Sequence, residues 1–246
     1  LSPVHNLALV LVLTFLLSFL AGALIYILIM RPMAGQPIFA AILVTVALGI
    51  MLRGIAILTW SARAQYPLDI LGVKNVAREL PGGIILSTFD LAQIASAVAL
   101  YLALFVFFRF SRLGIQMRAA AENPLLAAQR GINIHLLFAL SWSIATFTAA
   151  AAGVLYASNI RLDPGIADIG LKALAVPLAG GMGSLLGAIP AAIVIAGAEI
   201  ITIRGISGLW TGNPLLSNVM PFIIILIVML LRPWGILGKE EEIERV

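Results

Sequence analysis

Cysteine is absent from this sequence of 246 residues, and charged side chains are scarce. Without cysteine the chain can form no disulfide, no thiolate metal site and no cysteine nucleophile. Asp, Glu, Lys and Arg together make up 11% of the residues, whereas they make up roughly 25% of a soluble domain. The few basic residues are not interleaved with aromatic residues on a polar face, so nucleic acid is not an expected partner. No group of residues indicates a cofactor or a metal site.

Hydrophobic residues, in contrast, make up 62% of the chain and lie in long uncharged runs. Residues 7–30 carry no charge, and about 20 apolar residues are enough to cross the hydrocarbon core of a bilayer. This run has no basic lead-in and is too long for the core of a signal peptide, so we expect a retained transmembrane helix. Further spans are predicted at residues 91–108, 136–160 and 214–231.

One apolar segment near the N-terminus is interrupted by a charge. Residues 38–52 are apolar, Arg53 follows, and the apolar run then continues over residues 54–60. This pattern favours a broken or tilted helix. Thr45 lies within the interrupted segment, where its hydroxyl either lines a pathway or bonds to the backbone of its own helix.

A second interrupted segment covers residues 173–198. It contains Pro177, Pro190 and the sequence GGMGS at residues 180–184, which makes a straight helix improbable. We expect a short helix entering the bilayer, a turn at GGMGS and a second helix over residues 185–203. The predicted fold is therefore an all-α integral membrane protein, a polytopic helix bundle with broken or re-entrant helices.

The remaining segments are predicted to lie outside the membrane within a single transmembrane domain, residues 1–246. Residues 61–90 mix charges with proline and glycine, and residues 161–172 contain the turn sequence Asp-Pro-Gly. The tail at residues 239–246, KEEEIERV, is expected to be solvated.

The longest polar interruption between two strongly apolar runs is residues 109–135, which carry four arginines, Arg109, Arg112, Arg118 and Arg130. Within it, Asn123 can cap a helix that starts at Pro124, and Gly131 can end that helix. A helix over residues 124–130 is about 10 Å long and would not be stable alone in water. It therefore needs a surface, which is either another protein or the lipid headgroups.

The distribution of basic residues favours a cytoplasmic position for residues 109–135. If this loop and the C-terminus share a side, that side holds eight of the fifteen Lys and Arg residues. The totals barely differ, but Arg109, Arg112 and Arg232 lie directly at the ends of predicted spans, where the positive-inside rule applies.

Four stretches of the sequence together resemble a known family. They are RLGIQMRAAAENPLLAAQRGIN at residues 112–133, AAAAGVLY at 149–156, LKALAVPLAGGMGSLLGAIPAAIVIAGAE at 171–199 and LRPWGILG at 231–238. The chain resembles the permease subunits of branched-chain amino acid ABC importers over roughly residues 31–238. Members of that family usually carry an N-terminal helical region with a motif like Asn-Phe-Ala-His-Gly. That motif is absent here, and the chain begins on Leu1 rather than Met, so we expect an N-terminal portion to be missing.

The resemblance implies a multi-pass protein of the inner membrane without its own nucleotide site. Its implied partners are a related permease in a heterodimer, two cytoplasmic ATPase subunits, an external substrate-binding protein and membrane lipid. The segment around residues 112–131 would couple the permease to the ATPases. The candidate coupling residues are Arg118, Glu122, Asn123, Pro124, Leu126, Ala127, Arg130 and Gly131.

The broken segment and the interrupted span provide candidates for the substrate pathway. Broken helices expose backbone groups inside a membrane only where they line a cavity or are buried in protein. The candidate pathway residues are Thr45, Gly180, Gly181, Gly183 and Ser184. The alternative for GGMGS is a packing turn, in which glycine allows close approach of helices. Glu199, near the predicted end of the second helix, is expected to reach an interface; within the membrane it would be a functional candidate.

Three functions compete on this evidence. An ABC permease takes its energy from separate ATPases, which fits the absence of a GxxxxGK[ST] loop. An ion-coupled secondary transporter, or a channel for small polar solutes, would be expected to carry ionisable residues inside the clear spans, and these lack them. An intramembrane serine protease would need a base near the serine of GGMGS, but the two histidines, His5 and His135, lie at predicted helix ends. The sequence favours the permease of an importer for branched-chain or other apolar amino acids.

Overall fold

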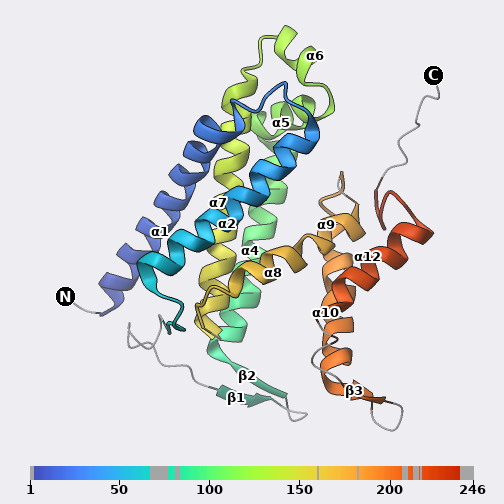
Figure 1. Cartoon of the computed structure of the whole chain (residues 1–246). Helices are drawn as coiled ribbons and strands as arrows, with labels where there is room; N and C mark the ends of the chain where they lie inside the picture. The colour runs from blue at the N-terminus through green and yellow to red at the C-terminus, as the bar shows by residue number, and fades with distance from the viewer. Residues whose placement is uncertain are drawn as a thin grey trace. The chain divides into compact units, whose positions relative to one another are not determined.

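The computed structural model describes residues 3–66, 77–80, 84–159, 161–181, 183–206, 210–212, 216 and 218–238. These residues are mainly helical and divide into two compact units, Leu1–Pro164 and Gly165–Val246. Figure 1 shows their elements, and each unit is described by itself. The predicted solvated tail, residues 239–246, lies outside the described residues.

The first unit is built on long apolar helices, as the uncharged runs predict. In the described part of the chain, four helices are long and apolar enough to cross a membrane, at Ala8–Met30, Phe39–Trp60, Thr88–Phe110 and Ile134–Ser158. They belong to α1 (Pro3–Ile25) with the π-helix η1 (Tyr26–Met30), α2 (Ile38–Trp60), α4 (Thr88–Phe110) and α7 (Ile134–Asn159). The spans predicted at residues 7–30, 91–108 and 136–160 are therefore confirmed.

Of the two interpretations of the interrupted segment, the broken helix is wrong, because α2 is one continuous helix from Ile38 to Trp60. Arg53 lies seven residues before Trp60, or about 10 Å along the helix axis. A long arginine side chain can extend from that depth towards the polar boundary, so the charge does not need to end the helix. Gly54 lowers helix stability by only about 1 kcal/mol relative to alanine.

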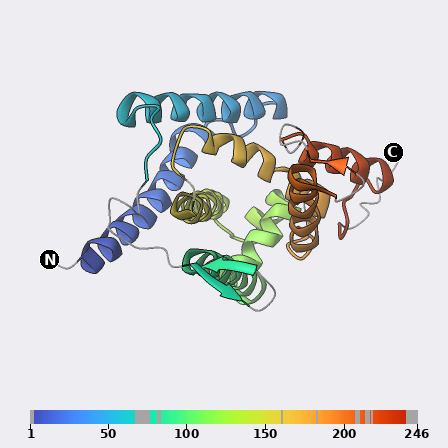
Figure 2. The ribbon, with the colours of Figure 1, turned by 90° about the horizontal axis from the view of Figure 1, so that it is seen from below.

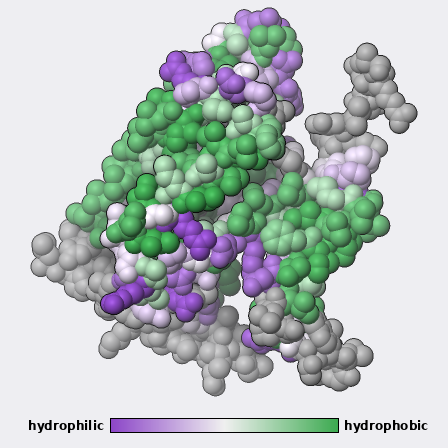
Figure 3. Space-filling view, in the orientation of Figure 1, coloured by the Kyte–Doolittle hydropathy of each residue, from purple (hydrophilic) through white to green (hydrophobic). Residues whose placement is uncertain are grey.

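Helix α2 follows the outside of the first unit in both ribbon views (Figures 1 and 2). None of the residues in its most apolar stretch is buried. In Figure 3, hydrophobic surface covers the helices of this unit between their two ends, and hydrophilic residues gather at the end that carries residues 112–131. This is the pattern of a surface that faces lipid or another membrane protein along its length and water at its ends.

Helices α1 and α7 pack closely through Gly22 of α1 and small and hydroxylated residues of α7. A Cβ atom at Gly22 would lie 2.6 Å from the Cα atom of Ser143, so only glycine fits at this crossing. The Thr146 hydroxyl bonds to the carbonyl oxygen of Ser18 at 2.8 Å. The rings of Phe15 and Phe147 lie 5.1 Å apart.

The segment before α4 forms an antiparallel hairpin, β1 (Ala77–Leu80) and β2 (Ile84–Ser87). It lies within the predicted loop at residues 61–90, of which residues 67–76 and 81–83 are outside the described part. Ser87 and Asp90 form a capping box, so α4 begins at Thr88, three residues before the predicted start. The strands were not predicted from the sequence.

A backbone bridge between Gln65 and Leu162 joins this loop to the segment after α7. The Arg161 side chain donates a hydrogen bond from Nε to Asp163 Oδ2 at 2.6 Å. This hydrogen bond, with the negative charge of Asp163, raises the pKa of the Arg161 guanidinium above its ordinary value.

The second unit contains shorter elements around a small apolar core. In chain order they are α8 (Ile166–Ala173), α9 (Ala175–Gly180), α10 (Ala188–Arg204), the short strands β3 (Gly205–Ile206) and β4 (Trp210–Thr211), and α12 (Met220–Leu231). The core joins α9 and α10 and is covered by apolar side chains of α12. Its buried residues are Ala175, Ala179, Ala191 and Ile195.

The predicted break in the segment 173–198 is confirmed, because α9 ends at Gly180 and α10 begins at Ala188. The starts of two helices in this unit differ from the prediction. Residues 166–172 are helical rather than a loop, because the turn ends at Gly165. Helix α10 begins at Ala188 rather than at residue 185, because residues 184–187 form a hydrogen-bonded turn.

The span predicted at residues 214–231 is also wrong in length. Helix α12 has 12 residues, or about 18 Å of helix, which is shorter than the ~30 Å hydrocarbon core. Pro221 explains the late start, since proline is tolerated in the first turn of a helix but not in its interior. Pro214 lies outside the described residues.

Candidate functional site

Two successive helices, α5 (Arg112–Glu122) and α6 (Pro124–Gln129), occupy the polar stretch between α4 and α7. We call residues 112–131 the α5–α6 module. The chain turns sharply into α5 at Ser111, whose Oγ accepts a hydrogen bond from the backbone N–H of Gly114 at 2.9 Å. A Cβ atom at Gly114 would lie 2.6 Å from the Cα atom of Phe108, so glycine permits the close contact of α5 with the end of α4.

The short helix in this module matches its sequence prediction. The Asn123 side chain accepts a hydrogen bond from the backbone N–H of Leu126 at 3.0 Å, and Pro124 is at the start of the helix. Gly131 follows the helix with a φ of 79°, which glycine adopts without strain. Helix α5, by contrast, was assigned to the loop. The Ser111 cap, followed by small or apolar residues at positions 114, 117 and 120, is the signal that could have identified it.

A small apolar core attaches the α5–α6 module to the long helices. Met117 and Ala120 from α5, Ala127 from α6 and Leu137 from α7 are all buried. The side chains packed around them come from the end of α4, from the turn before α7 and from the first half of α7, namely Phe107, Phe108, Ile132, Ile134, Leu140 and Ile144. Displacement of the module would therefore be transmitted to the ends of both helices, because a packed core resists deformation.

The outer surface of the module combines exposed leucines with charge. Leu125 and Leu126 are 70% and 57% exposed, which is unusual for leucine beside a polar loop. Among the predicted coupling residues, all are exposed except Ala127, which is 5% exposed and part of the core. The charged side chains that the module exposes are Arg112, Arg118, Glu122 and Arg130.

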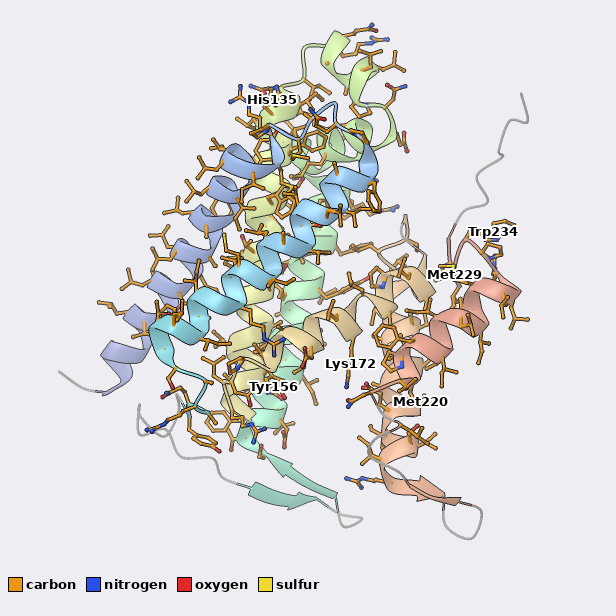
Figure 4. All side chains as sticks on the ribbon, viewed as in Figure 1. His135, Tyr156, Lys172, Met220, Met229 and Trp234 are labelled. Atoms are coloured by element: carbon orange, nitrogen blue, oxygen red, sulfur yellow. The ribbon has the colours of Figure 1, made fainter. Side chains whose placement is uncertain are left out.

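A polar contact joins the end of the first span to α7 next to the module. The Tyr26 hydroxyl lies 2.9 Å from Nδ1 of His135, which is the second residue of α7 and is labelled in Figure 4. Tyr26 is buried and begins the π-helix η1. His135 therefore has a structural partner in this unit.

In the described part of the chain, no group of acidic, histidine or cysteine residues has an arrangement that could hold a metal ion.

In the second unit, the glycines of the broken segment lie against other backbone atoms. A Cβ atom at Gly180 would lie 2.5 Å from the carbonyl oxygen of Gly187, across the turn between α9 and α10. Gly181 has a φ of 103°, and a Cβ atom there would lie 2.6 Å from the backbone nitrogen of Gly238. Both positions are thus restricted to glycine by packing, which was the alternative interpretation of GGMGS.

The partner of this turn is the segment that follows α12. The backbone N–H groups of Ile236 and Leu237 donate to the carbonyl oxygens of Ala179 and Gly180, at 2.8 and 3.1 Å. We call residues 232–238 the C-terminal clamp; in Figure 4 Trp234 marks its position beyond α12. The clamp supplies hydrogen bonds to backbone carbonyls at the end of α9. LRPWGILG contributes to the family resemblance, but nothing in its sequence predicts this contact.

The other predicted pathway residues have different surroundings. Gly183 is exposed with no heavy atom near its Cβ position, and Ser184 accepts a hydrogen bond through Oγ from the N–H of Gly187 at 3.1 Å. Met182 lies outside the described residues. Thr45 belongs to the first unit and donates to the carbonyl of Ile42 in its own helix at 2.7 Å. The assignment of these residues to a substrate pathway remains a prediction.

Comparison with known proteins identifies one family. A family model described as the branched-chain amino acid transport system permease component matches residues 1–229. The high-affinity branched-chain amino acid transport system permease protein LivH of Escherichia coli K12 is 35% identical over 147 residues, which is 59% of this chain and 46% of LivH. The corresponding protein BraD of Pseudomonas aeruginosa is 27% identical over 219 residues, which is 88% of this chain and 69% of BraD. The match thus spans about half the length of LivH. No solved structure matches the chain.

Proposed function

Because this chain belongs to the family of branched-chain amino acid transport permeases, we propose that it is a membrane subunit of an ATP-driven importer for branched-chain or other apolar amino acids. The protein is a multi-pass protein of the cell membrane. In this proposal it forms half of the translocation pathway and contains no nucleotide site of its own. It works with a related permease, two cytoplasmic ATPase subunits and an external substrate-binding protein.

The single observation that supports this function best is the α5–α6 module. Its most exposed leucines, Leu125 and Leu126, and its exposed charged side chains form a surface suited to a protein partner, since apolar anchors within a charged rim are typical of interfaces. Its buried side connects directly to the ends of two long helices. We propose that the ATPases dock on this surface through Arg118, Glu122, Leu125, Leu126 and Arg130, with Asn123, Pro124 and Gly131 holding the shape of α6.

The mechanism follows from that connection. When the ATPases bind ATP and close, they displace the module, and its core carries the displacement to the end of α4 and the start of α7. Tilting of α4 and α7 would open the pathway alternately to the two sides. The ATPases can shift this equilibrium only by contacting one state of the permease more favourably than the other. Affinity and most of the specificity for substrate reside in the binding protein.

An ion-coupled secondary transporter is the alternative, and the charges on the long helices do not favour it. Among the four described spans, Asp90 is in the first turn of α4 as a capping residue, and Arg109 is in its last turn. Arg53 is the remaining charged residue within these four spans. These residues do not form the intramembrane carboxylate or histidine relay that proton or sodium coupling uses.

Purification of the tagged chain from its native membrane tests the proposed function. We expect an ATPase and a second permease to co-purify, and L-leucine uptake by the reconstituted complex to require ATP inside and binding protein outside. Uptake should continue when ionophores collapse the proton and sodium gradients. Uptake that stops with those gradients, without a bound ATPase, would favour the secondary transporter instead.

The topology gives a separate prediction. Ser61 follows the end of α2 and is four residues before Gln65, which pairs with Leu162 after the end of α7. Ala128 is in α6, which precedes the start of α7. Helix α7 has 26 residues and is about 39 Å long, so the two positions lie on opposite sides of the membrane. Because the chain has no cysteine, Ser61→Cys should react with an impermeant thiol reagent in intact cells and Ala128→Cys only after permeabilisation. The opposite pattern would place the module outside the cell and exclude ATPase docking.

A further inference from the structure

One ion pair in the second unit has no role in the mechanism above. Lys172, in the last turn of α8, lies with its Nζ atom 3.6 Å from Oε1 of Glu199 in α10. Figure 4 labels Lys172 on α8. The two side chains come from separate helices, and both are about three-tenths exposed, at 29% and 28%. Part of each side chain is therefore accessible to a solute.

The geometry of this pair is incomplete as an internal salt bridge. A distance of 3.6 Å is too long for a hydrogen bond. The Glu199 Oε1 atom is itself buried, and among the described residues it has no hydrogen-bond partner. A buried charged oxygen without a donor is costly, so a ligand that brings a donor to it gains free energy that an already satisfied pair would not provide.

The pair lies near the end of α10. Glu199 lies five residues before Arg204, the last residue of α10, and the hairpin of β3 and β4 follows directly. Five residues of helix correspond to about 7.5 Å, so Glu199 is a little more than one helical turn from the start of that hairpin. The other ionisable groups nearby in sequence are Asp168, one turn before Lys172 on α8, and Arg204 itself, and both are exposed.

We propose that Lys172 and Glu199 form a transient contact site for the charged groups of a zwitterionic α-amino acid as it passes through the permease. The ammonium and carboxylate of such a substrate are attached to the same carbon atom, so they can meet a carboxylate and an ammonium that lie side by side. The substrate ammonium donates to Glu199, and the substrate carboxylate accepts from Lys172. The substrate thus replaces one long ion pair by two hydrogen-bonded ones.

A contact of this kind recognises the part that all amino acids share and leaves the apolar side chain to be selected elsewhere. Partial exposure keeps the contact weak, because ion pairs near water contribute little net affinity. Weak binding is what a transport pathway requires, since a tightly held substrate would not be released. This inference rests on the proposed function, because it takes the cargo to be an amino acid.

The test is L-leucine uptake by proteoliposomes that contain the complete transporter with its binding protein. Lys172→Gln and Glu199→Gln should each lower uptake by roughly two- to fivefold, the effect of losing a partly exposed ion pair that contributes about 1 kcal/mol or less. The thermal midpoint and the co-purification of the partners should match the wild type. Arg161→Gln is the matched control, because it breaks an exposed ion pair with Asp163 in the first unit and should leave uptake unchanged.

The double variant Lys172→Glu/Glu199→Lys separates substrate contact from structural pairing. This variant keeps opposite charges on the two helices but exchanges the positions of the carboxylate and the ammonium. Uptake should therefore remain low, while the stability of the protein is retained. Restored uptake in the double variant, or normal uptake in both single variants, overturns the inference. If wild-type proteoliposomes import no leucine, the proposed function fails first, and this result is distinct from the variant results.

A labelling experiment covers the case in which the single variants fail to assemble. Asp168→Cys leaves Lys172 and Glu199 intact and places an exposed thiol one helical turn from Lys172. Leucine-loaded binding protein should slow its reaction with an impermeant thiol reagent, compared with binding protein alone. Equal rates under the two conditions overturn the inference.

Discussion

Replacing Leu125 and Leu126 together by aspartate uncouples ATP hydrolysis from the arrival of substrate, while the permease remains folded in the membrane. Both leucines are exposed, so their replacement removes little packing within the chain. They also lie in the first turn of α6, where acidic side chains are favourable to the helix. If they anchor the ATPases, loss of the two together should cost about 2 kcal/mol or more, and docking should weaken by at least about 30-fold.

The measurement is ATP hydrolysis by the reconstituted transporter with and without substrate-loaded binding protein. The matched control is Ala34→Asp with Gln36→Asp, which adds the same two charges at exposed positions of the turn between η1 and α2. That double control should keep substrate-stimulated hydrolysis. Normal stimulation in the Leu125 and Leu126 variant would show that α6 is an interfacial helix on lipid rather than a docking element.

Ala127 has to be left unchanged in this experiment. The sequence places it beside Leu126 among the candidate coupling residues, but the structure buries it in the core under the module. An aspartate there would put a carboxylate among Met117, Ala120 and Leu137, which destabilises the fold whether or not the ATPases dock. The loss of coupling in such a variant would therefore not test the interface.

The second large effect is expected at Gly181. Its φ of 103° is a conformation that residues with a side chain rarely adopt, and holding one there costs about 1–3 kcal/mol. A methyl group at this position would also overlap the backbone of Gly238. Gly181→Ala should therefore displace the C-terminal clamp from the end of α9, lower the thermal midpoint of the purified protein by several degrees and reduce its assembly with the partner permease.

Gly183→Ala is the control for this substitution, since it changes the same residue type two positions away. Gly183 is exposed, has no heavy atom within 4 Å of its Cβ position and does not have a positive φ. The thermal midpoint of the Gly183→Ala variant should stay within about a degree of the wild type, because surface substitutions usually change the free energy of unfolding by less than about 0.5 kcal/mol. Equal midpoints for the two variants would mean that the clamp does not depend on the close approach at Gly181.

The sequence was informative where a residue acts on its own neighbours in the chain. Uncharged runs of sufficient length predicted the spans of α1, α4 and α7, because crossing a bilayer depends on length and polarity alone. The cap by Asn123, the start at Pro124 and the end at Gly131 predicted α6, since capping uses groups within four residues. The broken helix around GGMGS was likewise evident from its glycines and prolines.

The sequence was misleading where one residue can affect a helix in more than one way. The charge of Arg53 suggested a broken or tilted helix, yet α2 continues through it, because the side chain can extend along the helix surface. Helix α12 was predicted too long, since an apolar run does not reveal where proline forces the helix to begin.

What the sequence determined by itself is a membrane-spanning helical chain with a short capped helix in one polar loop, because span length and capping are local properties. Only the tertiary structure decided that Ala127 faces inward and Leu125 outward, that Gly181 contacts Gly238, and that Lys172 lies beside Glu199. These arrangements depend on contacts between segments that are separate in the sequence, and nothing in the spacing of one segment specifies which face of another it will meet.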